Sequence, residues 1–371
     1  MSTSVSDRTA PVRWDGDLGV FVVTGFEEAS AVLRGHGWSS DPAKSPLAPP
    51  ELSQIPTSLM LFRDPPDHTR LRRLVAPAFS ARAIESLRPR VASIVESSLD
   101  ALPGDGGEVD LVADYAYLIP MAVIAELLDV GVEGAEVFLE QTPRLARLLD
   151  LEASAEDAAD AVAAALEVTM FLTPILSRRR GQGRGDDFIS ALLAVDELAL
   201  EEVLATCVLL LAAGHETTAS LIGSGALALI QQPEQRPLLV ADPGRAVEEL
   251  IRMHGPVRII GRTALEDHDL GGIRVPQGQQ VLLRIDQAAQ DPTLWPDPAR
   301  LDLGRNGPAH LGFGTGIHFC LGAALARMEA AIALVGLFER YPSISLAEPA
   351  PAWRQSSTFH ALTALPVRLG A

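Results

Sequence analysis

A glycine-rich loop that carries one cysteine and leads directly into a helix-forming run constrains the fold of this chain more than any other stretch. The loop and the start of the run extend from His310 to Arg327, and His318 stands two residues before Cys320. A cysteine at the start of a helix has its thiolate stabilised by backbone N–H groups and by the helix dipole. The glycines allow the main chain to turn sharply and to come close to something large and flat. This pattern suits a metal held by one thiolate on the face of a planar macrocycle; the alternative is a buried structural cysteine beside a turn.

The same segment resembles the haem-binding loop of the cytochrome P450 family of haem-thiolate monooxygenases. The family pattern F-G-x-G-x-H-x-C-x-G-x-x-L-A-R is met at every specified position, which argues against a chance match. The matching residues are Phe313, Gly314, Gly316, His318, Cys320, Gly322, Leu325, Ala326 and Arg327. The resemblance implies that the Cys320 thiolate ligates the iron of haem b (iron protoporphyrin IX). It also implies that the haem is bound by Phe313, Gly314, His318 and Gly322.

The longest helix-forming run extends from Leu200 to Gln232, about thirty residues and so about 45 Å. It is largely apolar all round, which indicates a helix buried in the core. His215 and Glu216 interrupt the apolar run near its middle and argue against a membrane span. Thr217 can hydrogen-bond back to the carbonyl of Ala213, which would loosen the helix and open a notch for a small ligand. The alternative is a kinked helix whose polar groups are satisfied.

The stretch from Ala213 to Thr218 also resembles the family's oxygen-activation motif, A-G-x-E-T-T. The resemblance implies that Thr217 hydrogen-bonds dioxygen and that Glu216 belongs to the route that delivers protons. Thr217, Glu216 and Cys320 are therefore the predicted catalytic residues.

Three further cationic or donor residues match family positions that bind the haem propionates. His68 and Arg72 are four residues apart, so they share one face of the helix that opens at Asp64. The family motif D-P-P-x-H-x-x-x-R implies that they clamp a propionate; the alternative is an exposed polar face. Arg262, in a strand-like run, matches the family arginine that binds a propionate. The pair Glu249 and Arg252 is predicted to have a structural role only.

The resemblance also places a set of residues at the substrate pocket. These are Leu59, Leu61, Ala213, Val257, Arg258, Thr358 and Phe359, the last two at the tip of a hairpin predicted over residues 356–365. The set is mostly apolar, so a largely hydrophobic small molecule is the expected substrate. Arg258 is the one charged candidate and could pair with an anionic group of the substrate. The alternatives are a solvated arginine or a second propionate contact.

Electrons are expected from a separate protein, because no P-loop and no G-x-G-x-x-G site for a flavin or nicotinamide occurs in the chain. Seven arginines against three acids lie between Arg63 and Arg90, the one basic region in an acidic chain. This region is either a solvated helix face or a docking patch for an acidic, ferredoxin-like donor that works with its own reductase.

Composition excludes several other classes of protein. The net charge of −18 argues against nucleic acid and against an anionic membrane surface as partners. Two cysteines give no disulfide framework and fit a reducing cytoplasm; Cys207 is expected to pack in the core. The first residues contain no apolar run, so no signal peptide or membrane anchor is predicted. The expected fold is mainly α with small β-sheets (α+β), a single domain over residues 1–371 with a short, disordered extension at 1–13.

Local patterns predict several individual elements. A strand is expected over residues 19–24, a helix over 26–34 and a long proline-rich loop over 41–57. Prolines are expected to interrupt three helical stretches: 109–128 at Pro120, 133–149 near Pro143 and 156–178 near Pro174. Strands are expected over 255–264, 273–275 and 280–285.

The function predicted by the resemblance is hydroxylation of a small organic molecule with dioxygen, plausibly in bacterial secondary metabolism. One alternative is the same catalyst in a non-hydroxylating oxidation, such as ring coupling or epoxidation, on a carrier-bound substrate. Two others are a haem-thiolate sensor without turnover and a haem-free binding protein. The intact Thr217–Glu216 pair opposes the sensor, and the complete cysteine motif opposes the haem-free protein.

Overall fold

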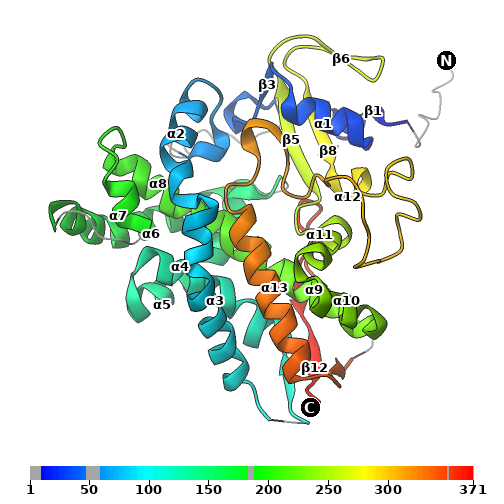
Figure 1. Cartoon of the computed structure of the whole chain (residues 1–371). Coiled ribbons are helices and arrows are strands. Elements are labelled where there is room, and N and C mark those ends of the chain that lie inside the picture. Colours follow the sequence, from blue (N-terminus) through cyan, green and yellow to red (C-terminus); the bar gives the residue numbers. More distant parts are fainter. Residues whose placement is uncertain are drawn as a thin grey trace.

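A computed structural model of the chain describes residues 10–46, 59–104, 106–151, 153–182, 188–348 and 351–370. A helical body and a smaller part that contains the main sheet meet along α9 and α13 (Figure 1). The helices are α1 Phe26–Arg34, α2 Asp67–Val75, α3 Ala81–Ala101, α4 Leu118–Leu128, α5 Gly131–Leu145, α6 Ala155–Gln182, α7 Phe188–Leu193, α8 Leu200–Leu210, α9 Glu216–Gln231, α10 Arg236–Ala241, α11 Pro243–His254, α12 Ile285–Ala288 and α13 Ala323–Arg340. Short 3₁₀ turns lie at Pro42–Lys44, Met60–Phe62, Ala76–Phe79, Ala146–Leu149, Pro233–Gln235 and Gly316–His318.

The main sheet has five strands in the order β1 Val12–Asp15, β2 Val20–Val23, β8 Gln280–Arg284, β5 Ile259–Ala264 and β3 Trp38–Ser39. Only β2 and β8 pair in parallel; the other neighbours are antiparallel. A second sheet joins β4 Glu108–Asp110, β12 Pro366–Arg368 and β9 Ser345–Leu346. Two strand pairs complete the set, β6 His268–Leu270 with β7 Ile273–Val275, and β10 Ala352–Trp353 with β11 Leu362–Ala364. The mainly α class with small sheets is therefore confirmed.

Several local predictions match the structure closely. The helix predicted over 26–34 is α1, and the predicted strands correspond to β2, β5, β7 and β8. Of the extension predicted to be disordered, residues 1–9 lie outside the described residues, while Val12 and Arg13 belong to β1. Of the predicted loop 41–57, Pro42–Lys44 forms a 3₁₀ turn, and residues 47–57 lie outside the described residues.

The helix break predicted near Pro174 is wrong. The other two stretches do change near their prolines: a π-helical segment, Val112–Ala116, gives way to α4 at Tyr117, and α5 ends at Leu145. α5 continues through Pro143, and α6 continues through Pro174. Each proline removes the hydrogen bond to the carbonyl four residues earlier, at Leu139 and Met170. Those two residues are 37% and 67% exposed, so water can reach the freed carbonyls. Pro120 lies in the first turn of α4, the part of a helix that tolerates proline best.

The long predicted helix is present but changes its winding in the middle. α8 leads into a π-helical segment, Leu211–His215, and α9 continues from Glu216. By length and apolar composition alone, this run and Ala155–Arg180 are each long enough to cross a membrane. A core helix passes the same test, and 61% of the most apolar window of Leu200–Gln231 is buried inside the protein.

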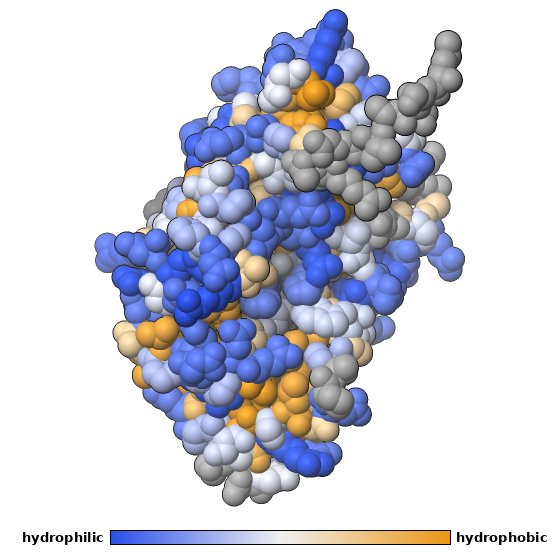
Figure 2. Space-filling model, turned by 90° about the vertical axis from the view of Figure 1, so that its right-hand side faces the viewer, coloured by the Kyte–Doolittle hydropathy of each residue, from blue (hydrophilic) through white to orange (hydrophobic). Residues whose placement is uncertain are grey.

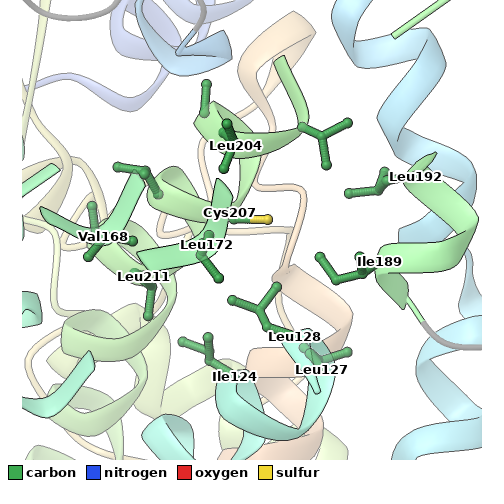
Figure 3. Close-up of a cluster of buried hydrophobic side chains, with 14 of the residues drawn as sticks. Ile124, Leu127, Leu128, Val168, Leu172, Ile189, Leu192, Leu204, Cys207 and Leu211 are labelled. Carbon is green, nitrogen blue, oxygen red and sulfur yellow. The ribbon is translucent and has the colours of Figure 1, made fainter. Parts of the chain in front are cut away.

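Cys207 lies in the apolar core, as predicted. It is fully buried among leucine, isoleucine and valine side chains of α4, α6, α7 and α8 (Figure 3). Burial raises the pKa of its thiol to about 12, so it stays protonated. Cys207 is therefore a packing residue.

The surface differs sharply from this core. The face that lies to the right in Figure 1 is mostly hydrophilic, with apolar side chains gathered in its lower part (Figure 2). α10, at the lower right of Figure 1, exposes Leu238 and Val240 by 38% and 48%. Apolar surface on this face is thus local rather than continuous.

A buried ion-pair network fixes α11 to the long segment before the cysteine loop. Arg252 Nε and Nη2 donate to the two oxygens of Glu249 at 2.7 and 2.9 Å, and both side chains are at most 3% exposed. Arg305 Nε donates to Glu249 Oε1 at 2.9 Å, and Arg252 Nη1 donates to the carbonyl of Ala289 at 2.7 Å. The predicted pair is thus one part of a brace that reaches two distant points of the chain.

We expect Arg252→Ala to lower the free energy of unfolding by about 3–5 kcal/mol, because it leaves the buried Glu249 carboxylate without its main partner. Chemical denaturation followed by circular dichroism measures this change. Arg274 pairs with Asp267 on the surface, with 77% of its side chain exposed, so Arg274→Ala is the matched control. Its effect should stay within about 0.5 kcal/mol. Equal effects of the two variants would contradict the structural role of the network.

Candidate active site

A cavity of about 710 Å³ lies where the helical body meets the main sheet. Its wall combines residues from α2, the cysteine loop, the middle of the α8–α9 run, β5 and the turn between β10 and β11. Cys320 and Thr217, which are more than a hundred residues apart in the sequence, line the same cavity. Its volume lies in the range of pockets for cofactors and small molecules.

The cysteine loop owes its shape to glycines at two positions. Gly314 and Gly316 have φ values of 66° and 72°, in the left-handed region that favours glycine. A Cβ atom at Gly316 would lie 2.2 Å from the carbonyl oxygen of Leu33 at the end of α1. The N–H of Cys320 donates to the carbonyl of Phe313 at 2.9 Å, which closes the loop on itself.

The loop is also braced by Arg327, the last residue of the motif. Its guanidinium lies 4.3 Å from the centre of the Phe313 ring and donates to Glu248 on α11. The Cys320 thiol is thereby presented to the cavity just before α13 begins. Burial raises the pKa of this thiol, whereas the Gly322 N–H and the charges of Arg72 and Arg327 lower it. Metal coordination deprotonates such a thiol outright.

The four residues predicted to bind propionates come together beside this loop. The His68 and His318 rings lie 4.2 Å apart between centres, and His318 Nε2 contacts Ser40 Oγ at 3.2 Å. Arg72 Nη2 donates to the carbonyl of Phe319 at 2.7 Å, and Arg262 Nη1 to that of Gly261 at 2.7 Å. Burial, followed by the charge of Arg262, lowers the pKa of His318 to about 3.

These cationic and donor groups lack acidic partners within the described residues. Within the described part of the chain, neither Arg72 nor Arg262 forms a salt bridge, and His68 Nδ1 is buried without a hydrogen-bond partner. Buried arginines are normally paired with carboxylates. The cluster therefore fits a ligand that brings its own acidic groups, as haem does.

The middle of the α8–α9 run opens toward the cavity as expected. Thr217 Oγ1 donates to the carbonyl of Ala213 at 2.7 Å, next to the π-helical segment. Ala213, Gly214 and Thr217 all line the cavity. The locally wider winding thus creates a notch with a threonine hydroxyl at its edge.

Glu216 lies on a different side of the helix and does not line the cavity. Its Oε1 pairs with Arg354 Nη2 at 2.8 Å, and its Oε2 accepts from the Tyr117 hydroxyl at 3.2 Å. Glu216 is 3% exposed, whereas the Arg354 side chain is 36% exposed. A chain of polar groups therefore leads from the surface to the buried carboxylate. No sequence motif marks Arg354 or Tyr117, so neither was predicted.

A third residue that the sequence did not predict is Glu329 on α13. It lines the cavity, and its Oε2 is buried without a hydrogen-bond partner among the described residues. Burial alone raises the pKa of this carboxyl to about 8, so it is protonated at neutral pH.

The residues predicted for the substrate pocket divide into two groups. The cavity wall includes Leu61, Ala213, Val257, Thr358 and Phe359. It does not include Leu59, which is packed in the core, or Arg258.

The placement of Arg258 at this cavity is therefore wrong. Val257 pairs with Phe359 in an isolated bridge and lines the cavity. Successive side chains of extended backbone point to opposite faces, so Arg258 points away and contacts His360 instead.

Three features surround one cavity: the cysteine loop, the cluster of arginines and histidines that lacks acidic partners among the described residues, and the Thr217 side of the α8–α9 run. This combination defines a haem-thiolate protein. Comparison with known proteins agrees. The model of the family described as cytochrome P450 matches residues 244–356. The chain is 38% identical over 385 residues to 6-deoxyerythronolide B hydroxylase of Saccharopolyspora erythraea, covering 98% of this chain and 94% of the relative. It is 39% identical to the cytochrome P450 monooxygenase PikC of Streptomyces venezuelae, covering 94% and 85%.

A solved structure, that of P450BioI in complex with an acyl carrier protein ligated to hexadec-9Z-enoic acid, superposes with a TM-score of 0.89. The two chains are 34% identical, with 97% of this chain and 95% of that chain covered. The chain belongs to the cytochrome P450 family and is a monooxygenase of that family. A haem iron is therefore its cofactor, and a small-molecule substrate and a redox partner are required.

The residues present fit this cofactor. Cys320 would provide the iron ligand, and His68, Arg72, Arg262 and His318 would hold the acidic groups of the macrocycle. When bound, haem iron with a thiolate ligand supplies the chemistry that splits dioxygen. The protein supplies the shape, the acid-binding cations and the exclusion of water.

The two cysteines give a matched test of the iron ligand. We expect Cys320→Ala to abolish the thiolate-type absorption band of the reduced, carbon-monoxide-treated protein, because it removes the only thiolate that lines the cavity within the described residues. Cys207→Ala should keep the band and lower only stability, because Cys207 packs in the core. Retention of the band in Cys320→Ala would overturn the assignment.

Proposed function

We propose that this enzyme hydroxylates a largely apolar, uncharged small molecule, using haem b and electrons from a ferredoxin-like donor with its own reductase. The observation that carries this proposal is the pairing of charge around the cavity. Arg284 on the wall is bonded to Asp286 at 2.8 and 2.6 Å, and Asp150 accepts from the Ser356 hydroxyl at 3.0 Å. Beyond the haem-binding cluster, most of the described wall is apolar, and its one further cation, Arg284, is paired with Asp286. A role in bacterial secondary metabolism is supported by the names of the relatives.

Thr217 is proposed to position dioxygen. In the structure the Thr217 hydroxyl donates its proton to the carbonyl of Ala213. Toward a molecule bound in the cavity, its oxygen atom can therefore act only as a hydrogen-bond acceptor. To donate a proton to dioxygen, the hydroxyl must rotate away from that carbonyl. This rotation breaks the 2.7 Å bond to the carbonyl of Ala213, which lies inside the π-helical segment.

Glu216 is proposed to bring protons from the surface to this hydroxyl. Both of its oxygens are engaged, by Arg354 and by Tyr117, on the side away from the cavity. The carboxylate can therefore exchange protons with solvent along the partly exposed side chain of Arg354. It must then turn toward Thr217, so the strength of the Arg354 pair sets how readily this happens.

The donor is proposed to dock beside the cysteine loop. Ile317 and Phe319 of the loop are 46% and 40% exposed, and Arg72 of α2 contacts the Phe319 carbonyl. Other arginines of the basic region are already paired: Arg90 contacts Glu126 at 2.8 Å, and Arg70 contacts Glu202. The docking patch is thus smaller than the sequence indicated, with apolar side chains at its centre. A cytoplasmic location is part of this proposal.

A second candidate function is oxidation of an acyl chain that is presented by a carrier protein. The solved relative in complex with an acylated carrier protein favours it. Two panels separate the candidates: free neutral macrolactones, and acyl chains carried on a carrier protein. Binding of a substrate beside the haem would shift the Soret band. A shift with free macrolactones alone supports the first candidate, and a shift with carrier-bound chains alone supports the second.

We expect Thr217→Val to lower the product formed per electron pair by about tenfold or more, because the hydroxyl that positions dioxygen is lost. Consumption of the electron donor should continue, with hydrogen peroxide in place of product. Thr169→Val is the matched control, since Thr169 makes the same back-bond, to Ala165 at 2.7 Å, in α6. Full product yield in Thr217→Val would contradict the role.

We expect Arg354→Gln to lower kcat by about tenfold with little change in KM, because Glu216 loses the cation that links it to solvent. The solvent deuterium isotope effect on kcat should rise at the same time. Arg368→Gln, which breaks a surface pair with Glu108, is the control. An unchanged kcat and isotope effect in Arg354→Gln would end the proposed role of Glu216 as a proton carrier.

A further inference from the structure

A second cavity, of about 150 Å³, lies behind one wall of the large one. Ile251, Val257 and Gly312 line both cavities and separate them. The small cavity is lined by five polar or charged side chains, those of Arg252, Arg258, Asp286, Gln290 and His360. It has room for about five water volumes, which is more than a small oxyanion needs.

The charges around this cavity do not cancel. Arg252 is neutralised by Glu249 at 2.7 Å, and Asp286 by Arg284 at 2.6 Å. Arg258, which is half-buried, pairs with no carboxylate among the described residues; its guanidinium donates to Nδ1 of His360. Burial, followed by the charge of Arg258, lowers the pKa of His360 to about 4, so the ring is neutral. One positive charge therefore faces the cavity without a counterion.

A second donor at this cavity is also poorly used. Gln290 Nε2 donates only to the sulfur of Met253, at 3.6 Å. A thioether is a weak acceptor, so a better one can replace it. Two donors from different segments, a guanidinium and an amide, thus line a space in which the carboxylate of Asp286 is already bonded to Arg284.

Two other arginines of this chain, Arg72 and Arg262, line a cavity without a carboxylate partner within the described residues, and both lie where the acidic groups of haem are expected. Arginines with a permanent role inside the fold, such as Arg252 and Arg284, carry their own acid. Arg258 resembles Arg72 and Arg262 in having no carboxylate partner within the described residues, although it faces a different cavity.

We propose that the small cavity is an anion site, in which Arg258 and Gln290 bind a carboxylate or phosphate group. The site is tied to the wall of the large cavity through the backbone. The N–H of Arg258 donates to the carbonyl of Thr358 at 2.8 Å, and that of His360 to the carbonyl of Pro256 at 2.7 Å. A bound anion therefore stabilises the ladder that holds Thr358 and Phe359 against the substrate, and substrate and anion affinities are linked.

Trp353 provides an optical reporter for this site. Its ring stacks on His360 with 4.0 Å between ring centres. The test titrates the haem-loaded, full-length enzyme with inorganic phosphate and, separately, with acetate, each against chloride at matched ionic strength. We expect a saturable change in tryptophan fluorescence with at least one of the two anions and a rise in the thermal midpoint. The anion that binds more tightly identifies the chemical class.

Substitutions decide whether the response comes from this cavity. Arg258→Gln should weaken anion binding by about tenfold or more, because it removes a charge-assisted contact. Gln290→Leu should weaken it by a smaller factor, and Arg274→Gln, the same charge change on the β6–β7 hairpin, should leave it unchanged. Trp353→Phe should lose the fluorescence change but keep the thermal shift. No response beyond chloride, or an equal response in Arg258→Gln, would overturn the proposal.

Discussion

The close contact between Gly316 and the end of α1 is the constraint on which the active site depends. A side chain cannot stand at position 316, because its Cβ would lie 2.2 Å from the Leu33 carbonyl oxygen. Glycine, with its positive φ and no side chain, lets the loop turn beside α1 and return so that the Cys320 N–H meets the Phe313 carbonyl. The direction of the thiol and the start of α13 both follow from that closure. The loop thus links the N-terminal helix, the cavity and the central helix of the fold.

Buried charge organises the rest of the cavity in two ways. Where the fold needs a permanent brace, an arginine is supplied with its own acid, as Arg252 is with Glu249. Where a ligand is to be bound, the cation is left without one, as in Arg72 and Arg262. An unpaired buried charge is unfavourable in the free protein. Binding of an anionic ligand pairs the charge and removes this cost. The same arginines that lower the stability of the ligand-free protein therefore favour binding of the ligand.

Short motifs made most of the candidate site predictable from the sequence. Spacing alone placed His68 and Arg72 on one helical face, and the structure brings both beside His318 and Arg262. Thr217 makes the predicted back-bond, because that bond depends only on local helix geometry. Residues whose partners are distant could not be found in this way. Arg354 lies 138 positions after Glu216 (354 − 216), and Arg305 joins Glu249 from 56 positions away.

The error at Arg258 shows why side-chain direction is harder to predict than position. The segment was placed correctly, since its neighbour Val257 lines the large cavity. The family resemblance placed Arg258 at the substrate pocket together with Val257, but the regular strand β5 begins only at Ile259. Before that point the backbone bonds to residues 358–360, and this second ladder sets the direction of Arg258. A positive charge that the sequence indicated for the substrate pocket therefore lies behind its wall, where it can act on the substrate only through Val257, Thr358 and Phe359.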